Sequence, residues 1–260
     1  MDYGLKGKRA LVTGGSHSIG LAVCRGLAEA GCHVALCSRS RTRLDQATAA
    51  IQRDDIEIRT IVADVLDPKQ IEQACRSLDS GWGGVDILIN NVGGGGRWGK
   101  PEVEDTDPAV WAEVHQKNAG AAIAFTRWAI PGMRSRQWGR VVTIASIYGR
   151  EGGGRPWFNM TKAAEISLMK TLAMTPYLAQ SGITFNTVAP GSIMIPDTGW
   201  AEERARAPAA FDAKVAQDFP LGRLGTPEEV AAIVLFACSA QASLLNGACI
   251  VVDGGESKSF

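Results

Sequence analysis

A hydroxyl, an aromatic ring and an ammonium group are spaced in this chain so that they would meet at one place. Ser146 follows the apolar run 139–145 and precedes a loop with four glycines and a proline. Beyond the loop, an amphipathic segment carries Phe158 and Lys162, whose spacing of four residues puts both on one face of a helix. These residue types predict a site where a hydroxyl and a positive charge lie beside a ring that has no proton to give.

A second stretch, TGGSHSIG at positions 13–20, has the composition of a phosphate-binding turn. It follows the short apolar run 9–13 and leads into an amphipathic segment at 19–30. Glycines let the backbone approach a pyrophosphate, and the first turn of the next helix offers free N–H groups to it. The stretch therefore predicts a dinucleotide site between a strand and a helix.

The elements that must position these groups alternate regularly along the chain. Short apolar runs alternating with amphipathic segments predict a parallel sheet covered by helices on both faces, wound in both directions from its centre. We therefore expect one α/β Rossmann domain, 1–260, with about seven strands and a helical insertion at about 192–218. Strands are expected at 9–13, 33–37, 58–63, 85–89, 141–145, 183–188 and 249–252, and helices at 19–30, 41–53, 68–79, 108–136, 157–181 and 227–239.

The polar and glycine-rich positions fall where these strands end. In a doubly wound sheet, ligands bind outside the carboxyl ends of the strands. The glycine turn, Asp64, Asn90, Ser146 and the pair 190–191 each follow a different predicted strand. Their agreement places one binding site along one edge of the sheet.

Together these motifs resemble those of the short-chain dehydrogenase/reductase family, and among its members the 3-oxoacyl-acyl-carrier-protein reductases and related keto reductases. The glycine turn is similar to the family's TGxxxGxG, and the segment 90–93, NNVG, to its NNAG. The segments GRLGTPEEVA at 222–231 and VVDGG at 251–255 extend the resemblance over essentially the whole chain. The resemblance implies a nicotinamide cofactor and a reaction at a ketone or a secondary alcohol.

In that family a Tyr gives a proton to the carbonyl oxygen, and a Lys lowers the pKa of the Tyr and holds the nicotinamide ribose. A Ser orients the carbonyl, and an Asn keeps a water that links the Lys to solvent. Ser146, Lys162 and Asn118 match these positions, whereas Phe158 occupies that of the Tyr. Loss of a general acid costs roughly 10²–10⁴-fold in rate. Tyr148 is a candidate replacement acid or only a pocket residue, and a water relayed through Asn118 and Lys162 is another candidate donor.

Two further departures from the family pattern lie near the cofactor. Ser18 stands at the middle glycine of the turn, where its Cβ is expected to weaken binding, and Ile195 stands where the family has a Thr. A Tyr→Phe substitution engineered to trap a bound ligand would explain Phe158 alone. The three departures together therefore favour natural divergence of the sequence. Three functions stay open: an oxidoreductase with a disabled or rerouted acid step, a non-redox isomerase or cyclase that keeps the cofactor, and a catalytically silent binding subunit.

The expected cofactor is NADP(H) rather than NAD(H). The second strand is followed by SRSR at 38–41, which contains no carboxylate. An arginine there, such as Arg39, would pair with the 2′-phosphate of NADP(H). The alternative is that Arg39 and Arg41 only solvate the start of the next helix. The predicted cofactor contacts are Gly14, Ser16, His17, Ser18, Ile19, Gly20, Ser38, Arg39, Asp64, Val65, Asn91, Val92, Gly93, Lys162, Pro190, Gly191, Ile193 and Ile195.

The substrate pocket is expected in the loops that surround the nicotinamide. Large apolar and aromatic residues gather there, which predicts a small carbonyl or alcohol substrate of apolar or aromatic character. The predicted pocket residues are Trp98, Tyr148, Arg155, Trp157, Met194 and Trp200.

The composition excludes several other classes of protein. Lys plus Arg and Asp plus Glu each total 27, and without a basic stripe no nucleic-acid partner is expected. The apolar run 231–240 is too short to span a bilayer, and residues 1–9 contain no apolar signal core, so we expect a cytoplasmic protein. The six cysteines and three histidines show no ligand-like spacing and predict no metal site. The family resemblance also implies a homotetramer, or a homodimer.

Overall fold

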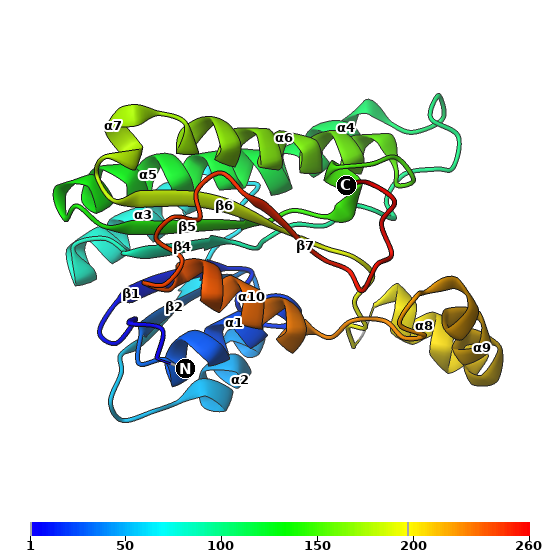
Figure 1. The fold of residues 1–260 in the computed structure, drawn as a ribbon, viewed down its shortest axis with the longest axis horizontal. Coiled ribbons are helices and arrows are strands. Elements are labelled where there is room, and N and C mark those ends of the chain that lie inside the picture. Colours follow the sequence, from blue (N-terminus) through cyan, green and yellow to red (C-terminus); the bar gives the residue numbers. More distant parts are fainter. Residues whose placement is uncertain (1, 197) are drawn as a thin grey trace.

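The computed structural model describes residues 2–196 and 198–260. Within these residues the centre is one parallel sheet of seven strands in the order β3-β2-β1-β4-β5-β6-β7 (Figure 1). The order reverses between β1 and β4, which is the switch point of a doubly wound sheet, and the predicted fold class is confirmed. The strands are β1 (Arg9–Thr13), β2 (His33–Ser38), β3 (Ile58–Val62), β4 (Ile87–Asn90), β5 (Gly139–Ile144), β6 (Ile183–Pro190) and β7 (Cys249–Val252).

Helices cover both faces of the sheet (Figure 1). One face packs against α1 (Ser18–Glu29), α2 (Arg41–Ile51) and α10 (Pro227–Cys238). The other face packs against α3 (Pro68–Trp82), α5 (Ala121–Ser135) and α6 (Pro156–Ala173). The other helical segments are α4 (Pro108–His115), the π-helical turn Gln116–Gly120, the 3₁₀ turn Ile147–Gly149, α7 (Pro176–Ala179), α8 (Gly199–Arg206) and α9 (Pro208–Asp218).

The central strands are apolar throughout because both of their faces are buried. In β1, Ala10 and Val12 belong to the core on the α1 side, whereas Leu11 belongs to the core on the α5 side. Successive side chains of a strand point to opposite faces, so a strand covered on both sides needs an unbroken apolar run. This is the pattern from which the strand was predicted.

Two predicted helices are divided in the structure. The helix expected at 108–136 contains a π-helical turn with Asn118 at its middle, between α4 and α5. The helix expected at 157–181 ends at Ala173, and α7 begins at Pro176, because a proline cannot donate the hydrogen bond that an uninterrupted helix needs. After each break, the following side chains point in other directions than they would on one continuous helix.

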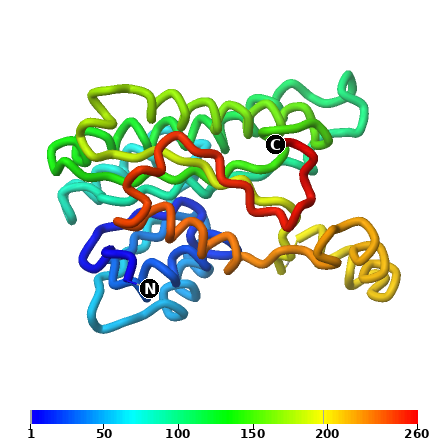
Figure 2. The backbone as a smooth tube through the Cα atoms, viewed as in Figure 1, coloured from blue at the N-terminus to red at the C-terminus, as the bar shows by residue number. Residues whose placement is uncertain are grey.

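The helices α8 and α9 occupy the stretch where a helical insertion was expected. Figure 2 shows residues 199–218, in yellow to orange, standing out from the rest of the chain beyond β6. They enclose a small apolar cluster of their own, made of Phe211, Val215 and Leu224 with Met194, Trp200 and Phe219 packed against it. The pair is therefore held by its own side chains together with those of the segments that flank it. No helix of the described residues is both long and apolar enough to span a membrane.

A buried carboxylate joins the amino ends of the central strands. Asp86 precedes β4, and its two oxygens accept from Arg9 Nε at 3.1 Å and Nη2 at 3.0 Å, while Arg136 Nε lies 2.8 Å from Oδ1. Burial alone would raise the pKa of Asp86, but the hydrogen bonds from Arg9 and the charge of Arg136 outweigh it and hold that pKa below its ordinary value.

We expect Asp86→Asn to destabilise the fold by about 3 kcal/mol, because two guanidinium groups lose their buried partner. A lowered pKa gives stability that is present near neutral pH and is lost as the pH falls toward about 4 and below. The difference in Tm between parent and variant should therefore shrink in acid, as measured by thermal unfolding across pH. The exposed pair Arg53–Asp55 provides the control, since Asp55→Asn should leave the Tm unchanged. An equal Tm for Asp86→Asn and the parent at neutral pH would contradict this account.

Candidate active site

Two cavities meet at the carboxyl edge of the sheet. The larger has a volume of about 930 Å³ and the smaller about 660 Å³. Phe158 lines both cavities, and so do Ile144, Ala145, Ile19 and Ile195. The ring of Phe158 therefore stands at their junction.

The larger cavity gathers most of the predicted cofactor residues. Pro190, Gly191 and Ile193 line the smaller cavity instead. Those that line the larger cavity are Gly14, Ser16, His17, Ser18, Ile19, Gly20, Ser38, Arg39, Asp64, Val65, Asn91, Val92, Gly93, Lys162 and Ile195.

The glycine turn is closely packed against the end of β4. Asn91 Nδ2 donates to the carbonyl oxygens of Thr13 at 2.9 Å and Gly14 at 3.2 Å. A Cβ on Gly20 would lie 2.6 Å from Asn91 Nδ2 and would also collide with the Gly14 carbonyl. Ser18 adopts φ 56°, a left-handed conformation that costs a non-glycine residue about 1–2 kcal/mol. The turn thus keeps the backbone bare where a pyrophosphate would approach.

Positive charge gathers at the end of the larger cavity that follows β2. Arg39 Nη1 lies 3.7 Å from Asp64 Oδ2. Arg43 and Lys117 also line this cavity and were not predicted. Burial lowers the pKa of Lys117, and the charge of Arg39 lowers it further. Burial likewise lowers the pKa of His17, with a smaller contribution from Arg43. The SRSRTR run held the signal for Arg43, whereas only the fold brings Lys117 here.

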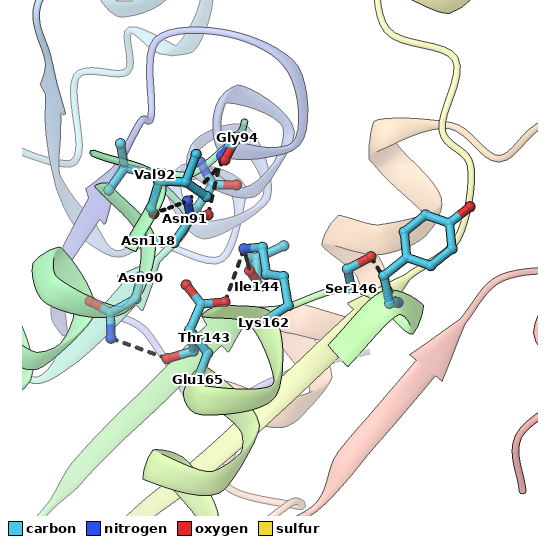
Figure 3. A network of polar contacts seen from close by, with 12 residues as sticks. Asn90, Asn91, Val92, Gly94, Asn118, Thr143, Ile144, Ser146, Lys162 and Glu165 are labelled. Atoms are coloured by element: carbon cyan, nitrogen blue, oxygen red, sulfur yellow. Dashed lines mark hydrogen bonds and ion pairs between the residues drawn. The ribbon is translucent and has the colours of Figure 1, made fainter. Parts of the chain in front are cut away.

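Lys162 is held inside the site by two acceptors (Figure 3). Its Nζ donates to the Ile144 carbonyl at 2.9 Å and to Glu165 Oε2 at 2.9 Å. The two side chains are only 5% and 2% exposed. Burial raises the pKa of Glu165, and the charge of Lys162 offsets part of that effect. Nζ also lies 5.7 Å from the centre of the Phe158 ring.

Glu165 was not among the predicted site residues. Its position three residues after Lys162 on a helix was the signal that could have found it, because such residues share a face. In the sequence, it had the pattern of an ordinary polar residue of an amphipathic helix.

Asn118 fixes the loop that follows β4. Its Oδ1 accepts from Gly94 N at 3.1 Å, and its Nδ2 donates to the carbonyl oxygens of Gly94 at 2.9 Å and Val114 at 2.8 Å (Figure 3). A Cβ on Gly93 would lie 2.6 Å from Asn118 Oδ1 and 3.3 Å from Lys162 Nζ. Asn118 and Lys162, two of the predicted catalytic residues, thus both lie against Gly93.

Ser146 and Tyr148 line the smaller cavity. Ser146 Oγ accepts from the backbone N–H of Tyr148 at 3.2 Å, which leaves the hydroxyl proton free for another acceptor. Burial raises the pKa of Tyr148, and the charges of Glu256 and Glu151 raise it further. The Tyr148 phenol therefore keeps its proton more firmly than an ordinary tyrosine.

Three of the six predicted substrate-pocket residues line the smaller cavity, namely Tyr148, Arg155 and Trp200. The prediction for Trp157 needs correction, because its ring is fully buried and packs on Trp111 at 5.2 Å. Trp157 precedes Phe158 on α6, and a step of one helical residue turns a side chain by about 100° away from its neighbour.

The other two predicted pocket residues also lie outside both cavities. Met194 packs in the apolar cluster of α8 and α9, and the ring of Trp98 lies 4.4 Å from Lys117 Nζ. Sequence reasoning missed Glu256, which lines the smaller cavity together with Arg97. Among the described residues, no group of three or more His, Cys, Asp or Glu side chains is placed to hold a metal ion.

Known proteins resemble this chain over its whole length. A family model described as enoyl-(acyl carrier protein) reductase matches residues 14–257. The chain belongs to the short-chain dehydrogenase/reductase family. Dehydrogenase/reductase SDR family member 4 of Oryctolagus cuniculus is 34% identical over 255 residues, covering 96% of this chain and 94% of that protein. The 3-oxoacyl-(acyl-carrier-protein) reductase of Aquifex aeolicus is 33% identical over 257 residues, covering 98% and 99%.

A solved structure agrees with this assignment to the short-chain dehydrogenase/reductase family. The crystal structure of L-sorbose reductase from Gluconobacter frateurii, complexed with NADPH and L-sorbose, has a TM-score of 0.90 with this chain. The two are 31% identical, and the comparison covers 100% of both chains. The larger cavity suits the nicotinamide dinucleotide of this family, since both bare glycine backbone and cationic groups line it.

We expect Gly20→Ala to weaken dinucleotide binding, because the new methyl group collides with the Gly14 carbonyl and the Asn91 amide. Overpacking costs about 1–3 kcal/mol, so the Kd for NADPH should rise about tenfold or more. Quenching of intrinsic fluorescence by the nucleotide measures it. Gly152→Ala is the matched control, since a Cβ there meets no atom within 4 Å. Equal NADPH affinity in the two variants would show that the turn does not hold the dinucleotide.

Proposed function

We propose that this protein is an NADP(H)-dependent oxidoreductase that reduces a small ketone or oxidises a secondary alcohol. The observation that carries the proposal is the junction at Phe158, where a dinucleotide-sized cavity with Lys162 on its wall meets a smaller cavity with Ser146 on its wall. The relation to a reductase whose structure holds NADPH and L-sorbose supports it. We propose that it acts in the cytoplasm as a homotetramer or homodimer, as the family resemblance implies.

The residues of the larger cavity would each hold one part of the cofactor. When bound, NADP(H) supplies or accepts a hydride at its nicotinamide ring. The turn 14–20 would receive the pyrophosphate, Arg39 and Arg43 the 2′-phosphate, and Lys162 the nicotinamide ribose. No acidic side chain follows β2 to bind a free 2′-hydroxyl, which supports NADP(H) over NAD(H).

The smaller cavity would hold the substrate. Ser146 would donate its free hydroxyl proton to the carbonyl oxygen and so orient it. Trp200 and the apolar wall near Ile193 and Ile195 favour an apolar or aromatic body. Arg97 closes one side, because it lies over the Trp200 ring at 5.1 Å and pairs with Glu203 at 3.0 Å. The proposed substrate is a small carbonyl compound or alcohol.

Arg39→Ala should raise the Kd for NADPH about tenfold or more, since a charged hydrogen bond to phosphate contributes about 1.5–3 kcal/mol. NADH lacks that phosphate, so its Kd should change by less than about threefold. Titration with both nucleotides measures the ratio. Arg41→Ala is the control, because Arg41 donates to Thr60 at 3.2 Å and lines neither cavity. A preference for NADPH that survives in Arg39→Ala would assign phosphate recognition elsewhere.

Phe158→Tyr should raise NADPH-dependent ketone reduction by roughly 10²–10⁴-fold, because it adds a general acid at the junction of the cavities. The rate is followed by nicotinamide absorbance with a panel of small ketones. Phe158→Leu is the control, since it changes the ring without adding an acid and should give no gain. Tight NADPH binding with no consumption in either Phe158→Tyr or the parent would contradict ketone reduction and favour a non-redox reaction or a silent binding subunit.

A further inference from the structure

Arg140 places a buried guanidinium group at the amino edge of the sheet, opposite the two cavities of the candidate active site. It is the second residue of β5, and it is only 4% exposed. Its side chain points to the face of the sheet that α10 covers, because Val142 and Ile144, at alternate positions of the same strand, belong to the core on that side. Figure 1 shows this edge of the sheet beside α7, away from α8 and α9.

One side of this guanidinium group has no partner among the described residues. Its Nη1 donates to the carbonyl oxygens of Gly139 at 2.8 Å and Gly182 at 3.1 Å. Its Nε is buried without a hydrogen-bond partner, and no hydrogen bond of the described residues uses Nη2. At the same edge of the sheet, Arg9 uses these two nitrogens, Nε and Nη2, to bind both oxygens of Asp86. The free side of Arg140 is therefore the side with which an arginine binds a carboxylate or a phosphate through two bonds.

No carboxylate of the described residues balances the positive charge of Arg140. Their ion pairs include neither Arg140 nor Lys8, although Lys8 Nζ and Arg140 Cζ lie 4.1 Å and 4.5 Å from the centre of the Trp138 ring. Burial lowers the pKa of Arg140, and the titratable neighbour that opposes this effect is the Cys238 thiol. Burial raises the pKa of that thiol, so it stays neutral and supplies no counter-charge. A buried charge without a partner is costly, and a bound anion would remove that cost.

A second buried polar group beside Arg140 also lacks a partner. Thr184 on β6 pairs with Arg140 in the register of the two strands, so the two side chains point to the same face of the sheet. Thr184 is 6% exposed, and its Oγ1 has no hydrogen-bond partner among the described residues. Both side chains line a cavity of about 360 Å³, which Trp138, Ser243 and Asn246 also line. A cation and a hydroxyl that lack partners in one cavity suit an anion with several oxygen atoms.

We propose that Arg140 and Thr184 form a binding site for a small oxyanion, a phosphate or carboxylate group, at the amino edge of the sheet. Its oxygens would accept from Nε and Nη2 of Arg140 and from the Thr184 hydroxyl. This cavity shares no lining residue with the proposed cofactor cavity, and the site does not depend on the proposed reaction. An oxyanion that binds only the folded chain would stabilise the fold by mass action.

The ring of Trp138 gives a local readout, because it lines this cavity and lies beside the Arg140 guanidinium. The full chain labelled with fluorotryptophan has a fluorine NMR resonance for Trp138, which is assigned by its loss in Trp138→Phe. We expect sodium phosphate to shift this resonance saturably, whereas sodium chloride at equal ionic strength should not. Sodium acetate is the second probe: a saturable shift with either oxyanion supports the site, and the lower Kd identifies the preferred group. The Kd should be the same with and without NADPH, because the dinucleotide cavity lies at the opposite edge of the sheet.

Two Thr→Val variants of β6 separate oxyanion binding from a structural role. Thr184→Val keeps the shape of the side chain but removes its hydroxyl, so the Kd for phosphate should rise about tenfold with the loss of a hydrogen bond to a charged group. Thr187→Val is the matched control, because Thr187 Oγ1 donates to the Ala248 carbonyl at 3.2 Å and lies outside the cavity, so the Kd should not change. In buffer without oxyanions, Thr187→Val should lower the Tm because a hydrogen bond is lost. Thr184→Val should not lower it, since its hydroxyl has no partner.

Arg140→Met should abolish the saturable shift of the Trp138 resonance, since it removes both the charge and the donors. If that variant does not fold, because the Gly139 and Gly182 carbonyls lose their donor, Thr184→Val still decides the question. The proposal is overturned by a Trp138 resonance that neither oxyanion shifts, or that chloride shifts equally. It is also overturned by a Kd for phosphate that rises when NADPH is added, by equal Kd values for Thr184→Val and the parent, or by a lower Tm of Thr184→Val without oxyanions.

Discussion

A buried ammonium must be balanced by charge or by strong acceptors, and the centre of this site is arranged around that constraint. Lys162 reaches the larger cavity from α6, with Ile144 and Glu165 as its two acceptors. The pairing of β4 with β5 ends at Asn90 and Thr143, one residue before Ile144. The carbonyl of Ile144 is therefore available to Lys162 rather than to a neighbouring strand, so the end of the sheet ladder helps to set the position of the charge.

The same edge of the sheet forms the floor of the dinucleotide cavity. Thr13 Oγ1 accepts from the backbone N–H groups of Asn91 at 3.0 Å and Val92 at 3.1 Å, while the Asn91 amide donates back to the turn. These bonds fix the turn after β1 against the end of β4. Gly93 then passes between Asn118 and Lys162, where a Cβ would collide with the amide oxygen. The cofactor cavity and the ammonium are thus held by one connected set of contacts.

Local patterns in the sequence were enough to predict the sheet, the glycine turn and the residues at the strand ends. An unbroken apolar run identifies a strand buried on both faces, and topology then brings strand ends together whatever their separation in the chain. Ser146, Lys162 and the turn at 14–20 were found in this way and line the two cavities.

What the sequence did not predict depends on side-chain direction within the helices. Trp157 and Phe158 are adjacent, yet one packs on Trp111 and the other lines both cavities, because helical rotation separates them. Lys117 reaches the larger cavity from a π-helical turn, and no sequence motif indicated that local geometry. Glu165 has the pattern of an ordinary polar helix residue until its burial is known, since only burial turns such a residue into a partner for Lys162.

Phe158 and Glu165 have to be considered together, since each determines how much charge surrounds Lys162. A phenol at position 158 would lie near the ammonium and would balance it whenever the phenol lost its proton. A benzyl ring offers only its π face, here 5.7 Å from Nζ, and this attraction is much weaker than that of a carboxylate in contact. Glu165 Oε2, at 2.9 Å from Nζ, is the carboxylate in contact with Lys162 among the ion pairs of the described residues. The absence of a phenol at position 158 and the presence of a buried carboxylate about two helical turns later are therefore physically consistent with one another.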